Sequence, residues 1–212
     1  NGIDIIRIFD ALNDVNNLKV AIEETVKSGA IASGTISYTT SPVHTREKYV
    51  EMVKELAQMG VGSICIKDMA GILTPAAAYD LVAAIKDAVD LPVVMHTHCT
   101  TGLAYMTYLK GIEAGADVID TAISPFSGGT SQPATETLAY ALKELGYEVE
   151  LDQPTLYKIA DYFKPIRNEY IKDGTLNPIS MGTDTQCLNY QIPGGMLSNL
   201  LSQLKSLNAL DK

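Results

Sequence analysis

The sequence predicts an α/β fold of parallel strands, a partial TIM (β/α)8 barrel of five βα units with a C-terminal helical extension. Two observations predict this fold. Up to residue 146, a short β-branched apolar run, a polar or glycine-rich break and a helical stretch repeat about every 30 residues. Residues with chemical functions also stand at the carboxyl ends of the runs, where a TIM barrel keeps its active site. No GxGxxG motif follows the first run, which argues against a dinucleotide-binding sheet.

The apolar runs and the helices between them follow one another in regular order. Each run is almost wholly apolar, as expected for strands that are covered on both faces of a parallel sheet. Residues that typically begin or end helices support these assignments: Thr74 and Pro75 mark a helix start, and Gly115 follows a helix end. The expected strands are Ile3–Asp10, Ala32–Thr39, Gly62–Asp68, Leu91–His98 and Ala116–Ile123, and the expected helices are Lys19–Val26, Glu47–Leu56, Ala76–Ala88, Leu103–Glu113 and Thr135–Leu145.

The repeating pattern stops after Gly146. Pro154–Tyr170 predicts one helix with a bend at Pro165, Asn177–Gln191 predicts a polar loop, and the sequence IPGGM introduces an amphipathic helix over Met196–Leu207. We therefore expect a partial barrel core over residues 1–150 and a helical extension over residues 151–212. A complete barrel needs eight βα units. The sequence thus indicates a fragment without three of the strands, which we expect to be inactive alone.

Composition and charge exclude several classes of protein. A hydrophobic content of 46% in 212 residues is enough for a folded core. The net charge is −9 and the basic residues are scattered, so nucleic acid is a poor candidate partner. Neither a long apolar span nor a leader-like segment is seen, so we expect a cytoplasmic protein. The cysteines are odd in number and lack CxxC spacing, which favours reduced thiols: Cys65, Cys99 and Cys187.

Three residues at strand ends are candidates for a metal site. His96 and His98 are two positions apart on one strand, so their side chains share a face and are able to share a metal. A structural, hydrogen-bonded pair is the alternative. Lys67 ends a buried strand, where an ammonium group is costly. It either forms a salt bridge to Asp68 or Asp120, or has a lowered pKa and a reactive neutral amine.

Other polar residues have weaker indications of function. Asp10 and Asp120 each end a strand, where they could orient a ligand, accept a proton or, as we favour, cap a turn. Cys99 faces away from its neighbour His98, and His44 fits a surface or helix-start position better than a ligand. The segment SPFSGGTSQP, residues 124–133, is either a hydroxyl-rich loop at the barrel mouth or a plain turn.

Five motifs, taken together and in order, resemble a known family. They are RIFDALND, CIKDMAG, HTHCTTG, DTAISPFSGGTSQP and YQIPGGM, spread from Arg7 to Met196. They resemble the carboxyltransferase domain of biotin-dependent enzymes. The alpha subunit of the sodium-pumping oxaloacetate decarboxylase is most similar, and the B subunit of two-subunit pyruvate carboxylases nearly as similar. The resemblance implies a TIM barrel with a helical extension.

The resemblance also implies a metal centre. By residue match, a carbamylated Lys67 binds a divalent metal together with His96 and His98. Zinc is expected, with cobalt and manganese as alternatives, because histidine and carbamate oxygen accept all three. In the family, a fourth ligand and a substrate-binding arginine lie on barrel strands that this sequence lacks.

Further residues acquire roles from the resemblance. Thr130 of the TSQP motif is implied to move a proton between biotin and the enolate of pyruvate, and Ser131 beside it to contribute to biotin binding. Asp10 matches an active-site aspartate near substrate and metal. The implied reaction moves the carboxyl group of oxaloacetate to biotin and releases pyruvate.

The resemblance implies several partners. No AMKM biotinylation motif is present, so we expect the biotin carrier domain downstream or on another chain. Membrane-embedded sodium-pump subunits would place the protein at the inner membrane surface, and the complete protein would form a homo-oligomer.

Other functions remain open on the sequence. The B subunit of a pyruvate carboxylase would run the reaction toward oxaloacetate. A metal-dependent lyase or synthase of the related barrel family would act on acyl-thioesters without biotin. A non-catalytic platform would only assemble carrier and membrane subunits.

Overall fold

The computed structural model describes residues 2–191, 196, 203 and 204. The chain divides into two compact units. Unit 1 comprises residues 1–68, 73–97 and 106–120, and unit 2 comprises residues 69–72, 98–105 and 121–212. The division into a core and an extension at residue 150 stays a prediction.

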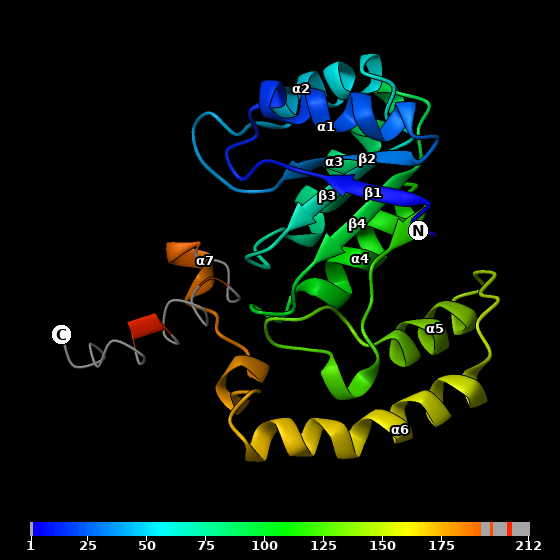
Figure 1. The fold of residues 1–212 in the computed structure, drawn as a ribbon, viewed down its shortest axis with the longest axis vertical. Helices are drawn as coiled ribbons and strands as arrows, with labels where there is room; N and C mark the ends of the chain where they lie inside the picture. The colour runs from blue at the N-terminus through cyan, green and yellow to red at the C-terminus, as the bar shows by residue number, and fades with distance from the viewer. Residues whose placement is uncertain (1, 192–195, 197–202, 205–212) are drawn as a thin grey trace. The chain divides into compact units, whose positions relative to one another are not determined.

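Unit 1 contains a parallel sheet of five strands that lie in the order of the sequence (Figure 1). Each strand pairs with the next along the chain, so the order never reverses, as in a barrel and unlike a doubly wound sheet. This confirms the α/β class and the partial barrel. The strands are β1 (Ile5–Ile8), β2 (Ile31–Ser37), β3 (Ser63–Asp68), β4 (Val93–Thr97) and β5 (Val118–Ile119).

The helices of unit 1 alternate with the strands. They are α1 (Val15–Lys27), α2 (Arg46–Gln58), α3 (Pro75–Ala88) and, from Met106 onward, α4 (Ala104–Glu113). The first three each begin at a side chain that accepts a main-chain N–H, which satisfies a donor that the helix cannot. These caps are Asp14, Thr45 and Thr74.

The two faces of the sheet differ in chemistry. A Cβ on Gly34 would lie 2.9 Å from Val61 and 3.4 Å from Leu56 of α2, so the even-numbered residues of β2 face the helices. The odd-numbered residues point to the opposite side, here called the inner face. The strand register places the following residues on the inner face: Arg7, Ser33, Thr35, Ser37, Cys65, Lys67, Val94, His96 and Val118.

Unit 2 is built from helices and loops. The helices over residues 135–144 and 153–172 pack together (Figure 1). Phe126 contacts Phe163 edge-to-face, with ring centroids 5.9 Å apart. The longer helix continues through Pro165. The elements are η1 (Ser124–Phe126), α5 (Thr135–Glu144), α6 (Gln153–Lys172), η2 (Pro178–Met181) and α7 (Cys187–Tyr190).

Several expected elements differ from those observed. The edge strands β1 and β5 are much shorter than expected, because each pairs with a single neighbour. The expected polar loop over residues 177–191 is wrong, since it holds η2 and α7. Asn177 starts η2 by accepting the N–H of Ile179 at 3.0 Å. The helix expected over residues 196–207 lies outside the described residues except at 196, 203 and 204. No helix in the described part of the chain combines the length and apolar character needed to cross a bilayer.

Candidate functional site

The inner face brings two of the predicted metal ligands together. Lys67 of β3 pairs in register with His96 of β4, both near the carboxyl ends of their strands. Side chains at paired positions of neighbouring strands project from the same face. The adjacency of these two residues within unit 1 is therefore a property of the sheet.

A carboxylate orients the imidazole of His96. Nδ1 of His96 lies 2.7 Å from Oδ2 of Asp120, and its side chain is only 14% exposed. Arg7 also binds Asp120: Nη1 donates to Oδ2, and Nη2 donates to Oδ1 at 3.3 Å. Partial burial alone would raise the pKa of Asp120, but the hydrogen bonds from His96 and Arg7 outweigh it and hold the pKa at about 2. Asp120 is thus an anion at neutral pH.

An anionic Asp120 selects one tautomer of His96. The carboxylate only accepts hydrogen bonds and lies closer to Nδ1 than Nη1 of Arg7, at 2.7 Å against 3.4 Å. Nδ1 of His96 therefore carries a proton, and in the neutral imidazole the lone pair is on Nε2. Imidazoles that bind metals are commonly held in this way by a carboxylate or a carbonyl. Of the roles expected for Asp120, orientation of another group fits this geometry.

Lys67 has no carboxylate partner in the described part of the chain, so the expected salt bridge to Asp68 or Asp120 is wrong there. Asp68 projects from the other face of β3, and Asp120 is held by His96 and Arg7. The ammonium group instead lies 4.9 Å from the ring centroid of Phe9. Burial lowers the pKa of Lys67, and the charge of Arg7 acts in the same direction.

Asp68 holds the ends of β3 and β4 together from the helix side. Its carboxylate is fully buried and accepts the hydroxyl of Thr97 at 2.7 Å and the N–H of Leu73 at 2.8 Å. Thr97 stands between the two histidines of the HTH motif. The buried carboxylate thereby fixes the strand end that carries His96.

Unit 2 contains the second histidine and the TSQP loop. Nδ1 of His98 lies 2.6 Å from the main-chain oxygen of Thr130, so it donates its proton there and leaves Nε2 with the lone pair. The N–H of Thr130 in turn donates to the oxygen of Ser180 at 2.9 Å. The hydroxyl of Thr130 has no hydrogen-bond partner among residues 2–191. The backbone of Thr130 thus orients His98, and this contact does not involve the side chain of Thr130.

The loops around His98 are closely packed. Gly71 has φ +69°, and a Cβ there would lie 2.5 Å from the main-chain oxygen of His98. Cys99 donates its N–H to the oxygen of Ser131 at 2.7 Å, and burial raises the pKa of its thiol to about 11. Cys99 is therefore protonated at neutral pH, in line with the minor role expected of it.

Asp10 and His44 occupy local structural positions. Oδ2 of Asp10 accepts the N–H groups of Asp14 at 3.1 Å and Leu12 at 2.9 Å, which lower the pKa of the carboxyl group. This is the capping role that the sequence favoured. Nδ1 of His44 lies 2.7 Å from Oγ of Ser41, just before α2.

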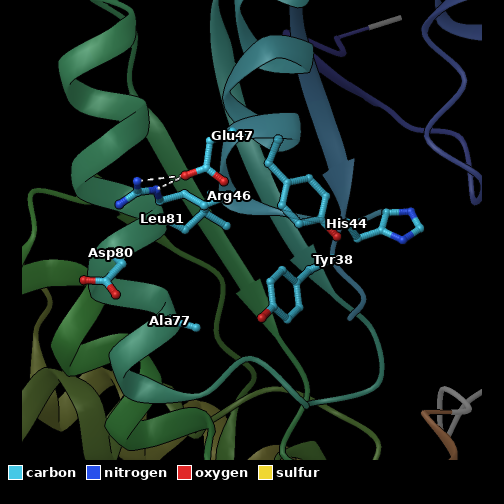
Figure 2. A pocket seen from close by; sticks show the side chains of 8 residues that line it. Tyr38, His44, Arg46, Glu47, Ala77, Asp80 and Leu81 are labelled. Atoms are coloured by element: carbon cyan, nitrogen blue, oxygen red, sulfur yellow. Dashed lines mark hydrogen bonds and ion pairs between the residues drawn. The ribbon is translucent and has the colours of Figure 1, made fainter. Parts of the chain in front are cut away.

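A cavity of about 350 Å³ in unit 1 is lined largely by residues of α2 and α3, whose side chains are drawn in Figure 2. The rings of Tyr38 and Tyr49 stack there with centroids 5.8 Å apart, and Arg46 pairs with Glu47 at 2.8 Å. His44 is the single predicted candidate that lines it. The lining residues are Tyr38, His44, Arg46, Glu47, Tyr49, Ala77, Asp80 and Leu81.

The donor chemistry fits a divalent metal only with a modified lysine. The described residues contain no group of three or more His, Cys, Asp or Glu side chains placed to hold a metal. His96 and His98 each have Nδ1 bound to an acceptor, as metal-bound imidazoles do. An ammonium group is no ligand, whereas a carbamate on Lys67 would supply oxygen.

Sequence reasoning missed the part played by Arg7. The signal was an arginine inside the apolar run IIRIFD, two positions after Ile5 and so on the same face of the strand. A charged residue at such a position needs a buried partner. Asp120 was identified as a candidate, but its pairing with Arg7 depends on the curvature of the sheet.

Comparisons with known proteins place the chain in a family. A family model described as HMGL-like matches residues 5–163. The chain is 57% identical over its whole length to the pyruvate carboxylase B subunit of Methanocaldococcus jannaschii, of which it spans 37%. It is 46% identical, again over its whole length, to the methylmalonyl-CoA carboxyltransferase 5S subunit of Propionibacterium freudenreichii subsp. shermanii, of which it spans 42%.

A solved structure has the same fold. The carboxyl transferase domain of Rhizobium etli pyruvate carboxylase with 3-hydroxypyruvate superposes with a TM-score of 0.89 and 33% sequence identity. The match covers 100% of this chain and 36% of that one. The sheet described above is thus part of a carboxyltransferase-type barrel, and the chain belongs to the HMGL-like family.

Proposed function

We propose that this chain forms the core of a biotin-dependent carboxyltransferase that moves a carboxyl group between biotin and the pyruvate–oxaloacetate pair. The observation that carries the proposal is the pairing of Lys67 with His96 on the inner face, where Asp120 and Arg7 fix the imidazole. The similarity to named carboxyltransferases supports it. Both kinds of support concern the core, and the activity of the whole protein is inferred.

In this proposal Lys67, as its carbamate, binds a divalent metal together with His96 and His98. Zinc is the first choice, with cobalt and manganese as alternatives. A metal bound there would act as a Lewis acid that stabilises the negative charge on the oxygen of the pyruvate enolate. The chain's own contribution is to hold Nδ1 of each histidine at an acceptor, Asp120 or the oxygen of Thr130, so that Nε2 is the nitrogen directed to the metal.

The lowered pKa of Lys67 supports its modification. Only a neutral amine attacks carbon dioxide: the nitrogen lone pair forms the new C–N bond, and the amine loses a proton to solvent. The product is an anion. Burial and the charge of Arg7 both disfavour an ammonium at this position, and the charge of Arg7 also favours that anion.

Thr130 is proposed to carry the proton. When the bond between C3 and the carboxyl group of oxaloacetate breaks, the electron pair of that bond stays on pyruvate, which becomes an enolate. The carboxyl group is released as carbon dioxide. Biotin bonds to that group through nitrogen and gives up a proton, which the Thr130 hydroxyl passes to C3 of the enolate. Ser131 is proposed to help bind biotin. Asp10 retains a proposed role near the substrate, although its observed contacts are those of a cap.

The direction of transfer is a separate part of the proposal. The oxaloacetate decarboxylase version releases pyruvate and engages membrane-embedded sodium-pump subunits. The similarity to proteins named as B subunits of pyruvate carboxylase favours the opposite direction, toward oxaloacetate. Both versions need a biotin carrier domain, and in both we propose a homo-oligomer.

Isotope exchange tests the reaction without the carrier. In the full-length protein that contains this chain, 14C should pass between pyruvate and oxaloacetate in the presence of free biotin. The variant Thr130→Ala should abolish exchange but still bind zinc, because its main-chain oxygen remains. Exchange that does not depend on biotin and that persists in Thr130→Ala would instead indicate a lyase that acts on acyl-thioesters. Absence of both exchange and metal binding would indicate a non-catalytic platform.

A further inference from the structure

Unit 2 contains a second pocket whose chemistry differs from that of the candidate site. Its volume is about 520 Å³, and it lies between η1, α6 and η2. Its lining residues are Ser124, Pro125, Ser127, Lys164, Arg167, Asn168 and Met181. Two of them are cations and three more have hydroxyl or amide groups, whereas none is acidic.

This absence of acidic lining residues stands out in a chain whose net charge is −9. Glu136 on α5 is not a lining residue, and its carboxylate accepts the N–H of Ser124 at 3.0 Å. The lining therefore offers mainly hydrogen-bond donors and positive charge. Such a surface is complementary to an anion.

Arg167 is the central group. Arg7 and Arg46 each pair with a carboxylate, whereas Arg167 has no such partner within the described part of the chain. Its Nη2 donates to Sδ of Met181 at 3.4 Å, and sulfur is a weak acceptor. The planar donors of the guanidinium group are thus available for a stronger acceptor.

The neighbouring groups are able to add further bonds. Lys164 pairs with Asp161 at 2.7 Å, but both side chains are more than 60% exposed, and such pairs are easily exchanged. The hydroxyl of Ser127 donates to the oxygen of Ser124 at 3.0 Å across an exposed turn. Rotation of that hydroxyl would direct it into the pocket.

We propose that this pocket binds a small oxyanion, through a carboxylate or phosphate group that pairs with Arg167 in bidentate fashion. Lys164 supplies the second charge, and Ser127 and Asn168 supply neutral donors. Arginine matches the planar arrangement of oxygens in both groups. The site does not depend on the proposed carboxyltransferase reaction.

The pocket is connected to the loop that holds His98. Ser127 belongs to the same loop as Thr130, and Met181 follows Ser180, whose oxygen accepts the N–H of Thr130. An anion bound between Ser127 and Met181 would therefore contact both segments that fix Thr130. All of these contacts lie within unit 2.

Calorimetric titration of the full-length protein tests the site, with inorganic phosphate in one arm and acetate in the other at low salt. We expect saturable binding of at least one anion, and the arm that binds identifies the group. Arg167→Gln should weaken binding about 10-fold or more, as expected for a charge-assisted bidentate pair. Arg46→Gln is the matched control, because it removes the same charge from an exposed ion pair, and its binding should stay unchanged.

Two outcomes would overturn the proposal. One is that the wild-type protein binds neither anion. The other is that Arg167→Gln and Arg46→Gln bind with equal affinity. If Arg167→Gln lowers the melting temperature, Lys164→Gln on the exposed side of α6 provides the same test with a smaller expected loss, about 3-fold, and unchanged affinity in that variant counts against the site.

Discussion

Arg7 at the first edge of the sheet and Asp120 just after the last strand form a bidentate ion pair over the inner face. The sheet is therefore curved enough for residues of its two outermost segments to touch. The same carboxylate holds Nδ1 of His96. The ion pair of Arg7 with Asp120 therefore depends on the curvature of the sheet, and its carboxylate orients the candidate metal ligand His96.

Removing the carboxylate should weaken metal binding without removing a ligand. Asp120→Asn is expected to lower zinc affinity about 10- to 100-fold, because an amide is able to donate to Nδ1 of His96 as well as accept from it and so no longer fixes the tautomer. A competition titration with a zinc chelator measures this in the full-length protein. Asp117→Asn is the control, since Asp117 binds Lys86 and the N–H of Val93 instead. Equal zinc affinity in the two variants would refute the orienting role.

Asp120 should also make stability depend on acid pH. Its pKa of about 2 lies below the usual value of 3.8, so its stabilising effect is complete above pH 4 and is lost as the pH falls toward 2. We expect a loss of about 2 kcal/mol over this range from this group. Urea unfolding should show a shallower acid dependence in Asp120→Asn than in the wild type. Parallel pH curves for the two proteins would contradict the prediction.

Carbamylation of Lys67 is directly observable. With 13C-labelled bicarbonate, a carbamate carbon signal should appear in the NMR spectrum and disappear in Lys67→Met, but not in the control Lys19→Met. The signal should grow as the pH rises through the lowered pKa of Lys67, because only the neutral amine reacts. A spectrum that is identical in wild type and Lys67→Met would rule the modification out.

The buried bond between Thr97 and Asp68 should contribute more than an ordinary threonine bond. Thr97→Val is expected to lower the free energy of unfolding by about 1.5–3 kcal/mol, since a buried carboxylate loses a donor. Thr25→Val is the matched control: that buried hydroxyl donates to the neutral oxygen of Ala21 at 2.7 Å, and its loss should cost about 1 kcal/mol. Urea denaturation measures both. Equal losses would mean that the charge of Asp68 adds nothing.

Close packing at Gly71 should couple this glycine to the position of His98. Gly71→Ala places a Cβ 2.5 Å from the oxygen of His98, so this backbone has to move and zinc affinity should fall. In Gly60→Ala, the φ of +85° is equally unfavourable, but no atom lies within 4 Å of the new Cβ. Both variants should lose about 1 kcal/mol of stability from the backbone strain. Zinc affinity should fall in Gly71→Ala alone, and a fall in both would assign the effect to general destabilisation.

The sequence predicted the parts of this structure that depend on periodicity and local chemistry. Alternating apolar runs and helices located the five strands, because burial on both faces leaves a clear signature. The HTH spacing and the strand-end position of Lys67 identified the candidates on the sheet. The short helices near Asn177 and Cys187 were missed because helices of four residues are too short to show a period.

The contacts that the sequence did not predict join residues that are far apart along the chain or depend on strand register. Arg7 and Asp120 are separated by 113 residues, so only the folded sheet shows that they meet. For Lys67, the sequence left a salt bridge and a desolvated amine as alternatives. The register of β3 with β4 sends Asp68 to the opposite face, and Asp120 pairs with Arg7 and His96, so neither forms the expected salt bridge with Lys67. The reactive amine stays a prediction. The sequence indicated the hydroxyl of Thr130, yet its carbonyl oxygen makes the observed contact.

The inner face of β2 carries Ser33, Thr35 and Ser37, which are nearly inaccessible to solvent, at 2%, 0% and 4%. Their side chains are small, so neighbouring groups pack closely against this part of the sheet. A leucine or methionine at the fully buried Thr35 would need more volume than this position provides, and the strands around it would have to shift. Polarity limits replacement as well as size, because all three hydroxyls are hydrogen-bonded: Ser33 accepts from Ser63, Thr35 donates to the oxygen of Ser33, and Ser37 donates to the oxygen of Asp10.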